Sequence, residues 1–270
     1  MQNAVSKQEL WLNPTNAQND PFDAYPSISI SPDAEVEQFI QKLRDKYGRY
    51  ISIFGTDLRT VAQNTQGFDD WDENVKKLVF SDQAMVRAAK TQIKKNFSKL
   101  REKTKIACFS EEMDSLLQWS HYANSHKGIC YEYEVRPFHD NRFSIVKLHK
   151  VDYCNKRPSI NTLEAAKFIC AQNLNDSSIF STDETKDILK RTTCIKSTEW
   201  KYEKEWRWIE SYEGDPDFHP ADALKLASLT FGANATSDTM DICKKIVGND
   251  IPLYKINLSK STYSLSRERI

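Results

Sequence analysis

Two stretches within the first hundred residues have the apolar spacing of amphipathic helices. After Pro32, four apolar side chains follow the i, i+3, i+4, i+7 order that places them on one helical face, namely Val36, Phe39, Ile40 and Leu43. Residues 72–100 show a second helical pattern, with several basic residues among its polar positions. Residues 13–30 are rich in Asn, Pro and Asp, so we expect an ordered loop there, after a short strand at residues 9–12.

From residue 105 onward, strand patterns alternate with helical ones. Residues 105–109 predict a buried strand, 114–123 a short helix and 128–134 another strand. Further strands are predicted at residues 143–153, 205–210, 226–231 and 253–258, and further helices at 161–180, 183–195 and 237–247. This order predicts an α+β fold in which residues 1–270 form a single domain and residues 161–195 a helical insertion within it.

Charge and hydropathy restrict the partners of this chain. The 38 Lys and Arg residues balance the 38 Asp and Glu residues, so no net field attracts nucleic acid or an anionic membrane. No apolar run reaches the roughly 20 residues of a membrane span, and the first ten residues lack the basic and apolar regions of a signal peptide. The sequence therefore predicts a cytoplasmic protein without a membrane partner.

Cysteine, glycine and histidine spacings argue against several common sites. The six cysteines include no CxxC pair, which favours reduced core thiols over a zinc cluster or disulfides. Neither GxGxxG nor GxxxxGK[ST] is present, which argues against a Rossmann or P-loop nucleotide site. The five histidines form no i, i+4 pair and HExxH is absent, so no metal is expected.

The densest polar segment of the chain lies at residues 118–128. The predicted helix places Trp119, Ser120 and His121 near its end, where a ring can stack on a planar ligand and an imidazole can donate or accept a proton. A structural alternative is that His121 and His126 only cap the helix or pack against it. Residue type alone leaves both interpretations open.

A second polar and aromatic segment lies at residues 200–209. If this segment is a strand, Glu203, Glu205 and Arg207 share one face and the aromatic residues share the other. That arrangement predicts a buried seam on the aromatic side and a polar cleft on the acidic side. The alternative is a structural Glu–Arg network on an exposed face.

Four motifs in this chain resemble the bacterial domain-of-unknown-function family 2971. They are Asn19-Asp20-Pro21-Phe22-Asp23, Cys108-Phe109-Ser110, Trp119-Ser120-His121-Tyr122-Ala123 with His126-Lys127-Gly128, and Trp200-Lys201-Tyr202-Glu203-Lys204-Glu205-Trp206-Arg207. Their order along the chain is that of the family. The family's usual first strand, Leu-Tyr-(His/Lys)-Tyr, is not found before Leu10-Trp11. Either the true start lies upstream of this one or the strand has been lost, and an edge left unpaired by such a loss would favour a homo-oligomer or a degenerate activity.

The layout of that family is similar to an ADP-ribosyltransferase-like fold, with a central, mostly antiparallel split sheet flanked by helices. This resemblance implies that NAD is a substrate and that no metal is required. It implies catalytic roles for Glu205, Glu203 and His121. It also implies that Ser110 lines the nicotinamide pocket, that Trp119 or Tyr122 stacks on the nicotinamide, and that Arg207 holds a phosphate or Glu205. The expected function is an NAD-consuming transferase or glycohydrolase in bacterial conflict or phage defence.

Two other classes of function fit the same residues. A nuclease or nucleic-acid-processing enzyme would use His121, His126 and Lys127 together with the basic helical stretch 90–101. The neutral net charge argues against nucleic acid as the favoured partner. A non-catalytic recognition module would instead use the aromatic surfaces of residues 119–122 and 206–208 to bind a partner.

Overall fold

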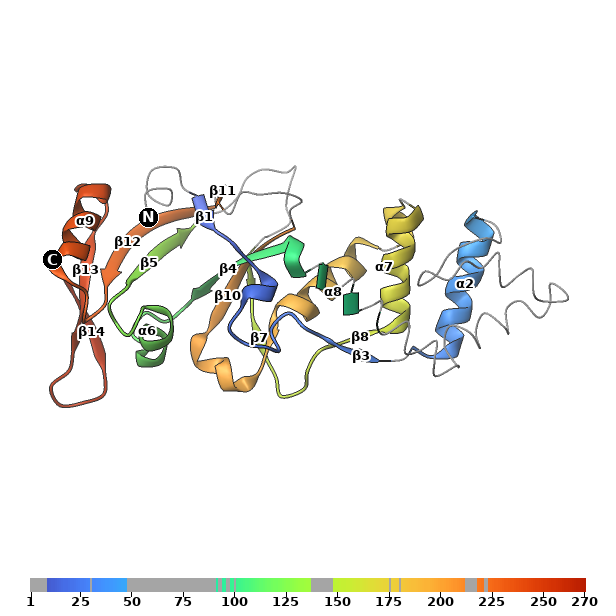
Figure 1. The fold of residues 1–270 in the computed structure, drawn as a ribbon, viewed down its shortest axis with the longest axis horizontal. Helices are drawn as coiled ribbons and strands as arrows, with labels where there is room; N and C mark the ends of the chain where they lie inside the picture. The colour runs from blue at the N-terminus through green and yellow to red at the C-terminus, as the bar shows by residue number, and fades with distance from the viewer. Residues whose placement is uncertain are drawn as a thin grey trace, which may run out of the picture. The chain divides into compact units, whose positions relative to one another are not determined.

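The computed structural model describes residues 9–29, 31–47, 91, 94–95, 98–99, 101–136, 148–174, 176–179, 181–211, 218–220 and 223–270 (Figure 1). The chain divides into two compact units. The first consists of Met1–Ala17, Thr104–Tyr153 and Thr198–Ile270, and the second of Gln18–Lys103 and Cys154–Ser197. The predicted insertion at residues 161–195 lies within the second unit, whereas the expectation of a single domain stays a prediction.

The first unit contains a four-stranded antiparallel sheet with the order β2-β4-β10-β6. Its strands are β2 (Asn13–Pro14), β4 (Thr104–Ser110), β10 (Glu205–Ser211) and β6 (Leu148–Lys150). In the β4–β10 pair, Glu205 lies opposite Ser110 and Arg207 opposite Cys108. This register places the start of β10 beside the end of β4, which is where the candidate site lies.

The second four-stranded sheet of this unit has the order β14-β13-β12-β5. Its strands are β5 (Ile129–Val135), β12 (Leu224–Phe231), β13 (Leu253–Leu258) and β14 (Leu265–Arg269). Only the β12–β13 pair within it is parallel, and α9 (Ser237–Val247) connects these two strands. Parallel strands need such a crossover connection, so the helix follows from the topology.

The amphipathic character of α9 explains one of the buried clusters of this unit. Cys243 and Val247 of the helix pack with Leu229 and Phe231 of β12 in one buried cluster. Thr236 caps the helix by accepting a hydrogen bond from the backbone N–H of Thr239 at 3.2 Å. Burial of these side chains supplies the main driving force for this sheet and helix to pack.

The two sheets of the first unit meet through apolar residues. Phe109 of β4 and Tyr133 of β5 pack edge to face, with ring centroids 5.8 Å apart. They adjoin a buried cluster that consists of Leu10, Leu12, Trp208 and Leu224. Leu10 comes from β1 (Glu9–Trp11), which pairs with β11 (Phe218–Pro220). Helix α6 (Leu116–Tyr122) follows β4 and precedes β5, so the chain passes from one sheet to the other through it.

The second unit is mainly helical. Its helices are α2 (Asp33–Tyr47), α7 (Thr162–Leu174) and α8 (Thr182–Thr193), and a short parallel pair joins β3 (Ser27–Ser29) to β8 (Ser159–Asn161). Phe39 and Leu43 of α2 are buried, as their spacing predicts. The described positions of the second predicted helix, 91, 94–95 and 98–99, are helical. Two short strands remain. Strand β7 (Asp152–Tyr153) belongs to the first unit and β9 (Ile195–Lys196) to the second.

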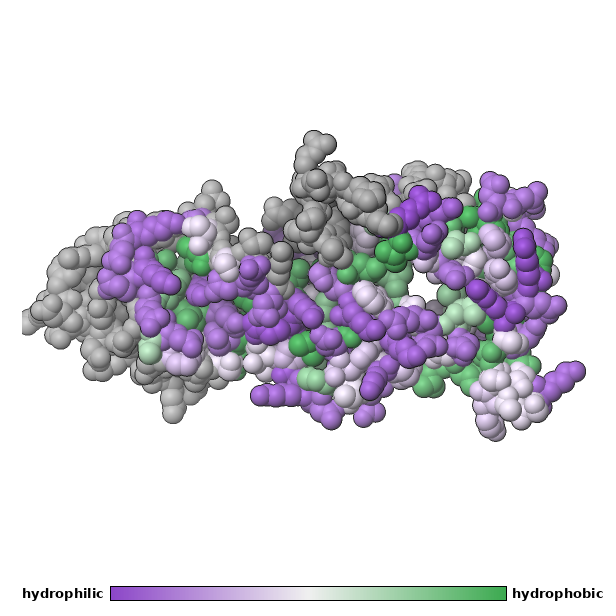
Figure 2. Space-filling view, turned by 180° about the vertical axis from the view of Figure 1, so that it is seen from behind, coloured by the Kyte–Doolittle hydropathy of each residue, from purple (hydrophilic) through white to green (hydrophobic). Residues whose placement is uncertain are grey.

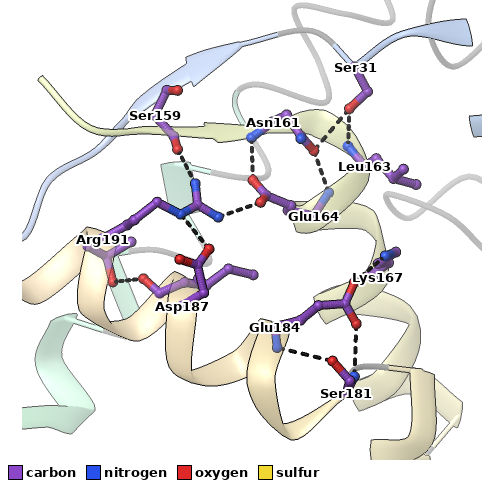
Figure 3. A network of polar contacts seen from close by, with 12 residues as sticks. Ser31, Ser159, Asn161, Leu163, Glu164, Lys167, Ser181, Glu184, Asp187 and Arg191 are labelled. Atoms are coloured by element: carbon purple, nitrogen blue, oxygen red, sulfur yellow. Dashed lines mark hydrogen bonds and ion pairs between the residues drawn. The ribbon is translucent and has the colours of Figure 1, made fainter. Parts of the chain in front are cut away.

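A polar network fixes α7 and α8 in the second unit (Figure 3). Ser31 Oγ accepts a hydrogen bond from the backbone N–H of Leu163 at 2.7 Å, at the start of α7. Arg191 of α8 bonds Glu164 of α7 at 2.5 Å and the backbone carbonyl of Ser159 at 2.7 Å. Charge-assisted hydrogen bonds of this kind hold their partners in one geometry, so this network is structural.

The model confirms the α+β class. Within the described residues, no helix has the length and apolar character needed to cross a bilayer. Seen from behind, hydrophilic residues cover most of the visible face, and hydrophobic residues border an opening toward the end that carries β13, β14 and α9 (Figure 2).

Candidate functional site

Helix α6 is anchored by its tryptophan. Trp119 is 4% exposed, packs with Ile256 and Leu265, and donates its indole N–H to the carbonyl of Met113 at 2.7 Å. Ser115 caps the helix through the backbone N–H of Gln118 at 3.4 Å. Trp119 thus lies in the interior, beside the β13–β14 sheet, rather than on an open surface.

Helix α6 also directs Tyr122 toward an acidic residue. Tyr122 Oη donates to Glu203 Oε1 at 2.5 Å. The tyrosine side chain is largely exposed, whereas Glu203 is 4% exposed. Glu203 ends the 3-10 helix η4 (Thr198–Glu203). An exposed phenol on one element therefore covers a buried carboxyl group on another, although the two residues are far apart in the sequence.

Two further side chains hold the backbone of Glu203. Ser110 Oγ donates to the Glu203 carbonyl at 2.7 Å, and Gln118 Nε2 donates to the same oxygen at 3.2 Å. Ser110 comes from the end of β4 and Gln118 from α6. The structure thus brings together Ser110, Tyr122 and Glu203, three of the residues that the sequence singled out, by contacts from β4, α6 and η4.

A left-handed residue separates the two glutamates of this segment. Lys204 has φ 46°, a conformation that few residues other than glycine adopt. Because this turn lies between η4 and β10, Glu203 does not belong to the strand that carries Glu205 and Arg207. The prediction that side chains alternate between the two faces of one strand is correct from Glu205 onward. It is wrong at Glu203, which precedes the strand. The lysine side chain itself contacts Glu112.

Glu205 and Arg207 form a buried ion pair. Arg207 Nε donates to Glu205 Oε1 at 2.7 Å, and Arg207 Nη2 donates to Oε2 at 3.1 Å. Arg207 is 0% exposed and Glu205 is 4% exposed. Tyr153 Oη also accepts a hydrogen bond from the backbone N–H of Glu205 at 2.8 Å. The acidic face of the strand is therefore neither an open polar cleft nor an exposed network, because both side chains are buried.

A separate polar cluster, called the outer cluster here, contains Trp206 at the start of β10. Glu111 Oε1 accepts hydrogen bonds from Lys150 Nζ and from Trp206 Nε1, both at 2.7 Å, and Lys150 lies over the Trp206 ring. The hydrogen bonds from Lys150 and Trp206 hold the pKa of Glu111 below its usual value. The contact of Glu112 with Lys204 lowers the pKa of the carboxyl group and raises that of the amine.

His121 lies at the edge of this site. Its side chain is exposed, and its ring meets that of Tyr122 at 6.2 Å between centroids. Among the described contacts, His121 is connected to the acidic residues only through Tyr122. The geometry therefore joins His121 to Glu203 by one intermediate side chain and shows no direct contact of His121 with Glu205.

Some residues of the site lacked a specific signal in the sequence. Three such residues are Gln118, Lys150 and Lys204. Their contacts in the site depend on the direction of the chain and on backbone conformation, which residue type does not reveal. Within the described ranges, no group of three His, Cys, Asp or Glu residues could hold a metal ion. Most of the basic stretch 90–101 lies outside the described residues, so a nucleic-acid surface there stays a prediction.

The chain was compared with protein families, curated proteins and solved structures. A family model described as a protein of unknown function, DUF2971, matches residues 118–208. No curated protein and no solved structure matches the chain. The matched range begins at Gln118 of α6 and ends at Trp208 of β10, so it contains Tyr122, Glu203 and the Glu205–Arg207 pair. This segment, which carries Tyr122 and Glu203, is therefore similar to the DUF2971 family.

Proposed function

We propose that this chain is an NAD-consuming enzyme, a transferase or glycohydrolase that breaks the bond between nicotinamide and ribose. The observation that carries the proposal is the hydrogen bond of 2.5 Å between Tyr122 Oη and Glu203 Oε1. It places an aromatic ring and a carboxyl group together at one accessible place. The resemblance to an ADP-ribosyltransferase-like layout gives the pair its proposed chemistry.

The proposed reaction needs a negative charge beside the ribose. As nicotinamide leaves, positive charge develops on the sugar, and a carboxylate aimed at this position stabilises it. In the hydrolytic form, water adds to the ribose carbon, nicotinamide departs as a neutral base and one proton is released. This scheme requires no metal ion.

Glu203 is a better candidate than Glu205 for the acidic catalytic residue. Both carboxylate oxygens of Glu205 accept hydrogen bonds from Arg207, and the pair is buried. Freeing Glu205 for a substrate would break this buried ion pair, which is strongly unfavourable. The Glu203 carboxyl group is instead bonded by Tyr122, a residue that is 53% exposed and that a substrate could displace. We assign Glu205 and Arg207 the role of supporting the strand next to the site.

The remaining residues have binding or positioning roles in this proposal. Tyr122 and His121 present exposed rings beside each other, so either ring can stack on nicotinamide. Of the two residues predicted to stack, Trp119 is in the interior and Tyr122 is exposed, which favours Tyr122 over Trp119. Ser110 holds the carbonyl of Glu203 and thereby fixes its carboxyl group.

Nicotinamide release from NAD by the purified chain tests this function. We expect Glu203→Gln to lower the rate by roughly a hundredfold or more, the loss typical when one charge-stabilising group is removed from an active site. Glu111→Gln is the matched control, because Glu111 is an exposed carboxylate of the neighbouring cluster. No nicotinamide release by the unaltered chain, either alone or with protein and nucleic-acid acceptors, would contradict the proposal.

The proposed setting is bacterial conflict or phage defence, in which NAD consumption would stop growth of the host cell. Expression of the unaltered chain should then lower cellular NAD, and the Glu203→Gln form should not. An equal loss of growth in both forms would show that toxicity does not depend on the carboxyl group.

One observation favours a second class, a recognition module without catalysis. Helix α6 exposes Leu116 by 37%, Leu117 by 51% and Tyr122 by 53%. Exposed apolar side chains on one short element are typical of a binding surface. Full biological activity of a His121→Ala, Glu205→Ala and Glu203→Ala triple variant would favour this class over the enzyme.

A further inference from the structure

Three consecutive residues after α6 have left-handed backbone conformations. The φ angles are 46° at Asn124, 55° at Ser125 and 66° at His126, and none of these residues is a glycine. Left-handed L-residues normally occur singly, because each places its Cβ too close to a carbonyl oxygen. A run of three persists only where the surrounding structure strongly determines it.

Backbone hydrogen bonds on both sides hold this turn. The N–H of Ser125 bonds the carbonyl of Ser120 at 3.3 Å, and the N–H of His126 bonds the carbonyl of Trp119 at 3.1 Å. From the other side, Asn234 donates its backbone N–H to the His126 carbonyl at 2.9 Å and its side-chain amide to the Ser125 carbonyl at 3.2 Å. The turn thus connects the end of α6 to the loop that follows β12.

The ring of His126 packs on Trp119. The two rings are nearly parallel, with 16° between their planes and 6.5 Å between their centroids. His126 Nδ1 is buried and has no hydrogen-bond partner among the described residues. A buried polar atom without a partner costs stability. The ring therefore contributes here through its shape and packing.

Gly232 allows the turn to approach the β12 loop. A Cβ atom at this position would lie 2.1 Å from the carbonyl oxygen of His126, too close for any side chain. That oxygen is the one that accepts the Asn234 N–H. Glycine is thus required here by close contact between two backbones.

We infer that Trp119, His126 and Gly232 form a positioning clamp that fixes the rotation of α6, so that Tyr122 reaches Glu203. Trp119 and Tyr122 are three positions apart on a helix of seven residues, so a rotation at one displaces the other. His126 is a positioning residue, since it acts through Trp119 and touches neither member of the Tyr122–Glu203 pair in the described contacts. The inference rests on the proposed function only in giving that pair its chemical role.

A double-mutant cycle on Tyr122→Phe and Glu203→Gln tests the clamp without any substrate. The cycle measures the coupling between the two residues from equilibrium unfolding of the full chain. It is then repeated in two His126 backgrounds. His126→Asn keeps a residue that tolerates the left-handed conformation and removes the ring, whereas His126→Phe keeps a ring that can pack on Trp119.

We expect the coupling to fall to less than half in the His126→Asn background and to be largely kept in His126→Phe. Unchanged coupling in His126→Asn, with only a loss of overall stability, would overturn the clamp and leave a purely structural role. Loss of coupling in both backgrounds would also overturn it, because ring packing would then not suffice. If either His126 variant fails to fold, Asn234→Ala loosens the same turn by removing the side-chain bond to the Ser125 carbonyl, and unchanged coupling in that background would likewise overturn the clamp.

The outcome separates this inference from the proposed function. Coupling that depends on the ring of His126, in a chain that releases no nicotinamide from NAD, would support the clamp and contradict the enzyme. Nicotinamide release that needs Glu203, with coupling indifferent to His126, would support the enzyme and overturn the clamp.

Discussion

Glu203 and Glu205 stand two positions apart, but the structure gives their carboxyl groups different surroundings. Both residues are 4% exposed. A buried guanidinium bonds the Glu205 carboxylate, whereas the phenol of an exposed tyrosine bonds the Glu203 carboxylate. Equal burial therefore does not mean equal function. A carboxylate closed by a buried cation supports the fold, and one covered by a movable surface side chain can be uncovered for a ligand.

The largest expected effect is the loss of stability when Glu205 loses its bond to Arg207. Arg207→Met should destabilise the chain by about 3 to 5 kcal/mol, because it leaves a buried carboxylate without its partner. Denaturant unfolding measures this loss. Lys150→Met is the matched control, since Lys150 pairs with Glu111 at an exposed site, where ion pairs contribute little to stability. Equal losses in the two variants would remove the distinction between the buried and exposed pairs.

A smaller loss of stability is expected when Glu203 loses its hydrogen bond from Tyr122. Tyr122→Phe removes one hydrogen bond at a partly exposed position and should cost about 1 kcal/mol. Tyr263→Phe is the control, because Tyr263 is 99% exposed and should not change stability. A loss as large as that of Arg207→Met would mean that the Tyr122–Glu203 pair is as structural as its neighbour.

The smallest expected effect is the pH dependence of the outer cluster. The folded-state pKa values of Glu111 and Glu112 are lowered by hydrogen bonds from Lys150 and Lys204, respectively. Their contributions to stability are therefore complete above the ordinary carboxyl pKa of 4.5 and are lost as the pH falls through the lowered values. Glu112→Gln should flatten the stability curve in this acidic range. High salt should have the same effect, because both groups are exposed to screening.

Elements with strong apolar periodicity could be predicted closely from the sequence. The helix predicted at residues 237–247 and the strand predicted at 253–258 have the observed bounds. The final strand β14 (Leu265–Arg269) was not predicted, because only Leu265 of its five residues is buried. An edge strand with polar side chains leaves no alternation of burial for the sequence to show.

The candidate site was predictable in its residue types and only partly in its geometry. Tyr122, Glu203 and Ser110 come together, as the motifs suggest. The break of the strand at Lys204 depends on a positive φ at a residue type that gives no sign of it. The inward orientation of Trp119 depends on packing with Ile256, which is remote in the sequence.

The most direct test of this account compares nicotinamide release and stability in Glu203→Gln and Glu205→Gln. We predict that Glu203→Gln loses roughly a hundredfold in rate while unfolding almost as the unaltered chain does. Glu205→Gln should lose several kcal/mol of stability and keep its rate where it is folded. A folded Glu205→Gln protein without activity, beside an active Glu203→Gln protein, would contradict the account.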